Sequence, residues 1–163
     1  MFVTQGINAT GIDQVIERAG VAKASLYNNF SGKSDLVAAY LDAQLAHFES
    51  LVTDLEESFE SAERIHHLFD RVKRASEGRS FHGCPFSKAS VELKAQSAGA
   101  KVIRRFYDRL ERFFADALGE PRDDVRVRQL VVVYDGAMTN AMVMRDSAGV
   151  AAAIALAQKI AAS

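Results

Sequence analysis

Two short apolar repeats on either side of a glycine constrain the fold of this chain more than any other feature. The first repeat lies in TGIDQVIERAG, where apolar residues recur at intervals of three and four, at Ile12, Val15, Ile16 and Ala19. This period predicts a helix of about ten residues with one narrow buried face. Thr10, followed three residues later by Asp13, resembles a capping box at its start, and Gly20 stands where a left-handed residue ends a helix.

The second repeat predicts another short helix, from about residue 22 to Asn29. Val21, Leu26 and Phe30 give this helix one apolar side. A helix of this length is not stable alone in water, so we expect it to pack against the first one. Two short helices joined by a tight turn that contains glycine form a helix-turn-helix.

The rest of the chain is expected to be helical as well. A long third helix begins at Ser31, which we expect to cap it, and continues to about Leu55. Helical periods separated by turn-forming residues predict further helices at 61–77, 87–96, 98–118, 123–145 and 148–162. The segments between them are EGRSFHGCP (77–85), SAG, GEPRD and DSAG. The sequence therefore predicts an all-α protein, with a helix-turn-helix module followed by a helical bundle.

The composition limits the partners that the chain can bind. Twenty Lys and Arg residues against 21 Asp and Glu give a net charge of −1, which argues against nucleic-acid binding by bulk charge. A single cysteine, Cys84, excludes an intramolecular disulfide and fits a reducing compartment. Neither a secretion leader nor a long apolar run is evident, so we expect a cytoplasmic protein with no membrane partner.

The outward side of the second short helix carries the residues that bear most directly on function. This side, opposite the apolar one, holds Lys23, Ala24, Tyr27 and Asn28. The set is small, basic, aromatic and amide-bearing, a combination that suits contact with nucleic acid. The alternative is a solvated helix face that carries one tyrosine.

The stretch TGIDQVIERAGVAKASLYNNFSGKSDLVAAYL resembles the DNA-binding region of the TetR family of bacterial transcriptional regulators. The resemblance is carried by Thr10, Ile12, Ile16, Ala19, Gly20, Val21, Lys23, Leu26, Tyr27, Phe30, Lys33 and Leu36. Farther along, GCPFSKASVEL and VVVYDGAMTNAMVM resemble more loosely the regulatory half of a subgroup of this family. The resemblance implies a homodimer that places one recognition helix per subunit in the major groove of a palindromic, double-stranded operator. It also implies a helical C-terminal domain that binds a small-molecule effector.

By position, the resemblance assigns DNA contacts to two groups of residues. The groove-facing group is Lys23, Ala24, Ser25, Tyr27 and Asn28. The second group, phosphate contacts at or near helix starts, is Thr10, Asn29 and Lys33. The chemistry agrees with this assignment, because Lys and Tyr hydrogen-bond phosphate and Asn pairs with an adenine edge.

This chain departs from the family's pattern in its first residues. The family usually has a whole helix before FVTQGINATG, and here Met1 is expected within the last turn of that helix. Ala22 stands where the family often has Ser or Thr, and Asn29 replaces its usual histidine. Residues 1–45 carry three basic residues against four acidic ones: Arg18, Lys23 and Lys33 against Asp13, Glu17, Asp35 and Asp42. We therefore expect this module to attract phosphate only weakly.

Two regions downstream are candidates for effector binding and dimerisation. We expect Phe69, Phe86 and Phe106 to lie nearest an apolar effector cavity, with a lipophilic molecule as the ligand. The stretch QLVVVYDGAMTNAMVM is apolar around most of its circumference, which predicts a second buried surface. Small residues suit a four-helix dimer interface at Gly136, Ala137, Ala141, Ala153 and Ala157. The alternative is a core helix buried entirely within one chain.

Other chemistry has little support in the sequence. Cys84, with His82 nearby, is either an oxidation-sensitive thiol or a small buried residue at a helix entry, and the second is commoner. His66 and His67 are adjacent and point to different helix faces, so no metal or other cofactor is expected. No phosphate-binding loop, nucleophile elbow or paired carboxylate indicates an enzyme.

The interpretation that follows is a ligand-responsive regulator that does not act as an enzyme. We expect a repressor whose effector changes the spacing of two recognition helices, with the long third helix as the lever. Its helix-turn-helix DNA-binding domain is expected at residues 1–45, and its ligand-binding and dimerisation domain at residues 46–163. The alternative is a helical dimer that does not bind DNA and serves as a small-molecule or partner-binding module.

Overall fold

The computed structural model describes residues 1–78 and 80–163, and within them every regular element is an α-helix. The all-α prediction is confirmed for these residues, whereas the predicted linker at 77–85 includes Arg79, which lies outside them. The chain divides into two compact units, each made from two stretches of sequence. The first unit consists of Met1–Ala46 and Pro85–Phe106, and the second of His47–Cys84 and Tyr107–Ser163. Whether residue 45 also separates two functional domains stays a prediction.

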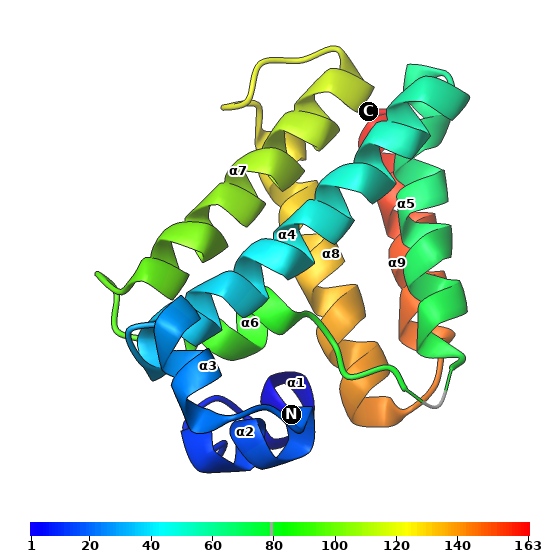
Figure 1. Cartoon of the computed structure of the whole chain (residues 1–163). Helices are drawn as coiled ribbons and strands as arrows, with labels where there is room; N and C mark the ends of the chain where they lie inside the picture. The colour runs from blue at the N-terminus through cyan, green and yellow to red at the C-terminus, as the bar shows by residue number, and fades with distance from the viewer. Residues whose placement is uncertain (79) are drawn as a thin grey trace. The chain divides into compact units, whose positions relative to one another are not determined.

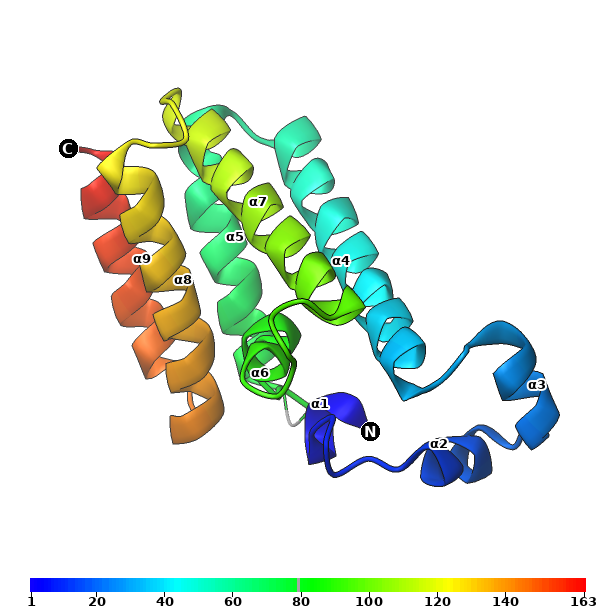
Figure 2. The same cartoon turned by 90° about the vertical axis from the view of Figure 1, so that its left-hand side faces the viewer.

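The first unit contains the predicted helix-turn-helix. Its helices are α1 (Phe2–Gln5), α2 (Ile12–Ala19), α3 (Lys23–Asn29), α6 (Pro85–Ser90) and the N-terminal parts of α4 (Lys33–Ser58) and α7 (Ala98–Leu118). Figures 1 and 2 show α2 and α3 as two short helices joined by a tight turn. Gly20 ends α2 in the left-handed conformation, with φ 65°, as the sequence predicts.

A small apolar core holds the first unit together. Leu26 of α3 is buried, as are Leu41 and Leu45 of α4. Phe86 of α6 stacks on Phe106 of α7, with the ring centroids 4.0 Å apart. Because burying each such side chain contributes roughly 1.5–3 kcal/mol, this core stabilises helices that are too short to persist alone.

The second unit is a bundle of longer helices. It contains α5 (Ser61–Ser76), α8 (Val125–Met144), α9 (Ala148–Ala161) and the C-terminal parts of α4 and α7. Helices α5, α8 and α9 lie side by side (Figures 1 and 2). The core is aromatic, with the ring of Phe69 6.3 Å from that of Phe114 and 6.1 Å from that of Tyr134. Burial raises the pKa of Tyr134 well above its ordinary value, so its hydroxyl stays protonated.

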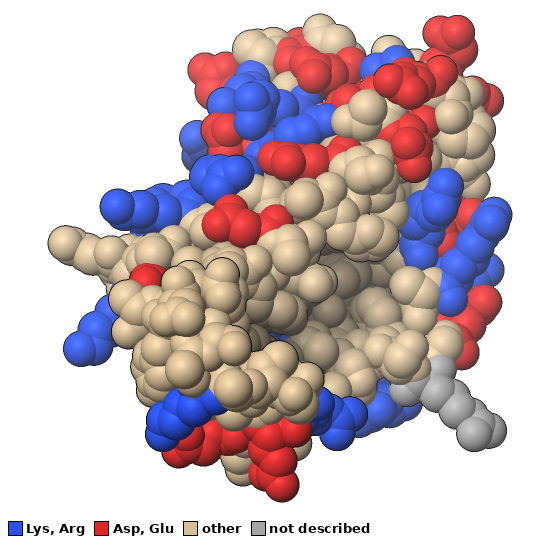
Figure 3. Space-filling view, viewed as in Figure 1, with Lys and Arg blue, Asp and Glu red and all other residues tan. Residues whose placement is uncertain are grey.

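Charged side chains fix the turn between α7 and α8. Arg122 lies 2.6 Å from Asp108 and 3.0 Å from Glu111, and Arg126 lies 3.1 Å from Asp124. Figure 3 shows basic and acidic side chains next to one another over this turn, at the top of the view. None of the helices in the described part of the chain is both long and apolar enough to cross a membrane.

One element is shorter than the sequence predicts. The helix expected at 87–96 is α6, and it spans only Pro85–Ser90. Pro85 occupies its first position, where the fixed φ of proline suits a helix start. Residues 91–97 form turns instead, and the side chain of Glu92 contacts the loop before α2. The contact of Glu92 with this loop follows the early end of α6. The apolar period of the sequence gives no sign of a contact over such a distance.

Candidate nucleic-acid interface

Helix α3 exposes nearly all of its side chains. Leu26, at 6% exposed, is its single buried residue. The other residues of the helix are exposed: Lys23, Ala24, Ser25, Tyr27, Asn28 and Asn29. We call these six residues the α3 face. The residues predicted to face the groove all belong to it, so each of them is accessible to a large partner.

An ion pair engages the basic residue of the α3 face. Lys23 Nζ lies 3.0 Å from Asp13 Oδ1 on α2. A hydrogen bond to Asp13 and the charge of that carboxylate raise the pKa of Lys23. In Figure 3 acidic and basic side chains lie close together over this part of the first unit. The charge of the ammonium group is therefore partly neutralised within the chain.

Two predicted phosphate contacts have partners within the chain. Asn29 donates its side-chain amide to the carbonyl of Ser25 at 2.8 Å, which supports the last turn of α3. Lys33 Nζ lies 3.4 Å from the carbonyl oxygen of Asn8, in the loop before α2. Both side chains have further donor hydrogens, so their contact with phosphate stays a prediction.

Thr10 does not lie where the sequence interpretation placed it. It is fully buried, at 0% exposed, and its hydroxyl donates to the carbonyl of Gly6 at 2.6 Å. The N-cap of α2 is Gly11, whose amide donates to Gln14 Oε1 at 2.8 Å. Because its hydroxyl is held inside the loop, Thr10 does not cap α2, and we leave it out of the proposed interface.

The apolar side of α2 is only partly covered. Ile12, Val15 and Ile16 are half-buried, and Ala19 is exposed. The expected buried stripe therefore exists in three of its four positions, and none of the three is fully enclosed.

The predicted effector-pocket residues are all buried, at 2% exposed or less. Phe86 and Phe106 stack on each other in the first unit, whereas Phe69 belongs to the core of the second unit. The three residues therefore do not meet within one unit. Their part in effector binding stays a prediction.

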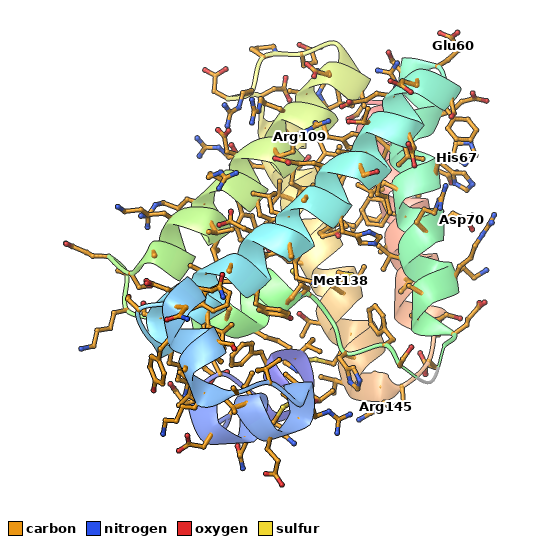
Figure 4. The ribbon with its side chains drawn as sticks, viewed as in Figure 1. Glu60, His67, Asp70, Arg109, Met138 and Arg145 are labelled. Carbon is orange, nitrogen blue, oxygen red and sulfur yellow. The ribbon has the colours of Figure 1, made fainter. Side chains whose placement is uncertain are left out.

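The second unit contains a cavity that the sequence did not indicate. It measures about 570 Å³ and lies between the first two turns of α5 and the C-terminal ends of α7 and α9. Its lining includes Ile65, Leu118 and Gln158, and Gln158 Nε2 lies 3.4 Å from His66 Nδ1. His67, labelled in Figure 4, stacks on Phe59 with ring centroids 3.6 Å apart. No group of three or more His, Cys, Asp or Glu side chains suited to a metal ion occurs among the described residues.

Four of the predicted dimer-interface residues are buried within the chain itself. Each is at most 8% exposed: Ala137, Ala141, Ala153 and Ala157. They lie on the inner sides of α8 and α9, which pack against each other and against α5. Gly136 is exposed. This part of the interpretation is corrected, because the small alanines bring helices of one chain together and offer no surface to a second.

Larger apolar residues are exposed on the same two helices. Val132 and Val143 of α8 are 70% and 65% exposed, and Leu156 of α9 is 49% exposed. Val132, Gly136 and Val143 follow one another at intervals of four and seven, so they share one side of α8. We call these four residues the α8–α9 face. Helix α8 is therefore not enclosed within one chain, which was the alternative to an interface.

Sequence reasoning missed two charged residues of the first unit. Glu92 accepts hydrogen bonds from the backbone amides of Ile7 and Asn8, and Lys88 donates to the carbonyl of Val3. Each contact joins residues 84 or 85 positions apart. No local pattern indicates such a pairing, since its partners are backbone groups of a distant loop.

The fold and the α3 face define a helix-turn-helix regulator of the DNA-binding class. Residues 1–40 match the family model described as bacterial regulatory proteins, tetR family. An uncharacterized HTH-type transcriptional regulator of Mycobacterium tuberculosis is 29% identical over 159 residues, which cover 87% of this chain and 78% of that protein. The N-terminal region of the chain thus matches the TetR family, whose members are transcriptional regulators and not enzymes. The family resemblance seen in the sequence is thus confirmed.

Other similar proteins agree with this assignment. The HTH-type transcriptional activator FasR of Mycolicibacterium smegmatis is 30% identical over 86 residues, which cover 48% of this chain and 38% of FasR. The match thus spans less than half the length of that relative. The crystal structure of a TetR-family transcriptional regulator from Streptomyces coelicolor has a TM-score of 0.92 at 23% identity, with 99% of this chain and 88% of that chain covered. This likeness concerns the fold.

Proposed function

We propose that this chain is a dimeric transcriptional repressor that binds a palindromic operator and is released by a small-molecule effector. The observation that carries DNA binding is the α3 face, which exposes six of the seven side chains of α3. The second helix of a helix-turn-helix enters the major groove, and insertion requires such an exposed face. The family match at residues 1–40 supports the same role.

The side chains of the α3 face suit distinct roles in a major groove. Asn28 presents an amide that pairs with N6 and N7 of adenine. Tyr27 and Lys23 hydrogen-bond phosphate oxygens. Ala24 and Ser25 are small, which lets the helix backbone approach the bases. Two residues near helix ends add contacts at the rim, namely Asn29 and Lys33.

The α8–α9 face supports a homodimer. Its apolar side chains are 49–70% exposed, and on α8 they fall on one side of the helix, where a partner can cover them together. A second copy of the chain presents the same face, so two-fold pairing buries both in a four-helix arrangement. Two recognition helices related by a two-fold axis match a palindromic operator.

Repression and effector release are the finer part of the proposal. An effector that binds better to the form with the wrong helix spacing shifts the population away from DNA binding. The cavity of about 570 Å³ in the second unit suits a small and partly apolar ligand, although none of the predicted residues Phe69, Phe86 and Phe106 lines it. FasR is named an activator, so whether this chain represses or activates transcription needs its own test. With a promoter reporter, repression predicts higher expression when the regulator is absent, and activation predicts lower expression.

A binding titration tests DNA recognition. Fluorescence anisotropy compares a palindromic fragment from upstream of the chain's own gene with random DNA at low salt. We expect a preference for the palindrome, and we expect Asn28→Ala to lower affinity for it about tenfold. The matched control is Gln96→Ala, an exposed amide in the turn before α7, which should bind as the wild type does. Equal affinity for both DNAs supports instead a helical dimer that binds other partners.

A thermal-shift panel tests the effector. Small lipophilic molecules are added singly to the purified chain, and the melting temperature is recorded. A ligand that binds only the folded state raises it in a concentration-dependent way. The same ligand should weaken binding to the palindromic DNA. A flat response across the panel contradicts a lipophilic effector.

A further inference from the structure

The loop before α2 is shaped around the carboxylate of Glu92. Ile7 donates its backbone amide to Glu92 Oε1 at 3.0 Å, and Asn8 donates to Oε2 at 2.7 Å. Gly6 has φ +92°, and a Cβ atom at this position would lie 3.1 Å from Glu92 Oε1. The backbone conformation therefore favours glycine here, and a side chain at this position would press on the carboxylate.

Positive charges surround the same carboxylate. Lys88 Nζ donates to the carbonyl of Val3 at 2.6 Å, and Lys33 Nζ reaches the carbonyl of Asn8 at 3.4 Å. The hydrogen bond from Asn8, then that from Ile7, then the charges of the two lysines hold the pKa of Glu92 below its ordinary value. The carboxylate is thus ionised at neutral pH and keeps both amide partners.

The loop that Glu92 holds leads directly into α2. Thr10 closes it, because its hydroxyl donates to the carbonyl of Gly6 at 2.6 Å and its amide to that of Ile7 at 3.3 Å. Gly11, the next residue, is the N-cap of α2. A shift of this loop therefore changes the start of α2, which packs against the recognition helix α3.

The segment that carries Glu92 is joined to the second unit at both ends. Residues 85–106 belong to the first unit, but the chain enters them from Cys84 and leaves them through Tyr107, which belong to the second. Helix α7 is continuous across the second of these points. The segment that carries Glu92 is therefore covalently continuous with the second unit at both of its ends.

We infer that Glu92 and Lys88 are positioning residues for DNA binding, through which the regulatory unit fixes the start of the helix-turn-helix. Their contacts with the loop hold α2, and with it α3, in the arrangement that binds DNA. This inference rests on the proposed function, because it assigns a role in DNA binding to residues that do not belong to the α3 face.

Hydrogen exchange measures the contact directly. In the intact chain, Glu92→Gln keeps the size of the side chain but replaces one acceptor oxygen by an NH2 group, which cannot accept an amide hydrogen. We expect the amides of Ile7 and Asn8 to exchange about tenfold faster or more, as the loss of a charge-assisted hydrogen bond implies. The control Glu49→Gln, an exposed glutamate of α4, should leave these amides unchanged. Unchanged exchange in Glu92→Gln would overturn the inference.

DNA affinity decides whether the contact serves function. Glu92→Gln removes a negative charge, so simple electrostatics predicts tighter binding to DNA, whereas a positioning role predicts binding about tenfold weaker. The salt dependence should keep the wild-type slope, because no phosphate contact is lost. Unchanged or tighter binding of the palindromic fragment contradicts the inference and leaves the proposed function standing. Wild-type protein without preference for the palindrome contradicts the proposed function, and the positioning role falls with it.

Two variants that change no charge test the inference if Glu92→Gln does not fold. Gly6→Ala places a methyl group against Glu92 and should lower DNA affinity. Gly119→Ala introduces the same kind of substitution at φ +68° in the second unit, where no atom lies within 4 Å of the added methyl group. Both variants place alanine at a positive φ, so a loss of DNA binding confined to Gly6→Ala, in protein that stays folded, supports the inference. Equal effects in the two variants overturn it.

Discussion

Lys23 illustrates how one residue sets the electrostatics of this surface. It is the basic residue of the α3 face, and Asp13 holds it at 3.0 Å. An exposed pair of this kind is weak, and it competes with phosphate for the same ammonium group. In the proposed complex with DNA, affinity therefore depends on how readily Lys23 leaves Asp13.

Replacing Asp13 by Asn should release Lys23 for phosphate. We expect Asp13→Asn to bind the palindromic fragment about threefold tighter and with a steeper salt dependence, because about one more counterion is released from DNA. Anisotropy titrations at several salt concentrations measure both quantities. Asp54→Asn makes the same charge change on an exposed part of α4 in the second unit. An equal gain in both variants would assign the effect to net charge alone.

Glu92 gives a pH prediction at the same scale. Its pKa is lowered in the folded chain, so its stabilising contribution is present above the ordinary glutamate value and is lost as pH falls through the folded-state value. Protection of the Ile7 and Asn8 amides, corrected for intrinsic exchange, should stay constant from about pH 6 to 8 and fall only below about pH 4. Nuclear magnetic resonance exchange rates test this. A loss of protection between pH 6 and 8 would contradict it.

At the scale of helices, the packing of α8 on α9 depends on Gly149. A Cβ atom at this position would lie 1.9 Å from Asn140 Oδ1 and 3.1 Å from Asn140 Cβ. We expect Gly149→Ala to lower the free energy of unfolding by about 1–3 kcal/mol, since the neighbour must move. Gly136→Ala is the matched variant within one chain, because no atom of the chain lies within 4 Å of its added methyl group, and unfolding is measured at a concentration at which the chain is monomeric. It should raise stability by up to about 1 kcal/mol through helix propensity, and urea unfolding that ranks the two variants the other way contradicts this packing.

The α8–α9 face gives the second prediction about helices. Val132→Glu and Leu156→Glu place charges on exposed apolar positions, where a monomer tolerates them and a buried dimer interface does not. Light scattering at micromolar concentration should report a dimer for the wild type and a monomer for each variant. Val91→Glu is the control, since Val91 is 85% exposed and lies in the first unit. A monomeric wild type would remove the dimer from the proposal.

For the molecule as a whole, the sequence predicts those features of the fold that depend on the local spacing of apolar residues. The short helices α2 and α3, the left-handed Gly20 and the long α4 follow from apolar spacing and glycine placement. The exposed α3 face follows in the same way, because Leu26 alone points inward. The burial of a side chain against a helix that is distant in the sequence does not follow from apolar spacing. Period alone cannot tell that Ala137 meets a helix of its own chain rather than a partner.

In the candidate site, too, the exposed helix residues were predictable from the sequence, whereas the residues that bind distant backbone groups were not. Its surface residues, such as Tyr27 and Asn28, were predictable because an exposed helix side needs no knowledge of the rest of the fold. Thr10 was misplaced because its hydroxyl turns back to the loop at Gly6. Glu92 was missed because its partners are backbone amides 84 and 85 positions away. Side chains that bind distant backbone leave no periodic signal.

The central claim is that α3 reads the major groove of a palindromic operator, once from each subunit. Methylation interference tests it most directly, because methyl groups on guanine N7 lie in the major groove and those on adenine N3 lie in the minor groove. The account predicts that N7 methylation blocks binding in two symmetric patches, about one helical turn or a multiple of it apart. Interference confined to adenine N3, or a single patch without a symmetric counterpart, would contradict it.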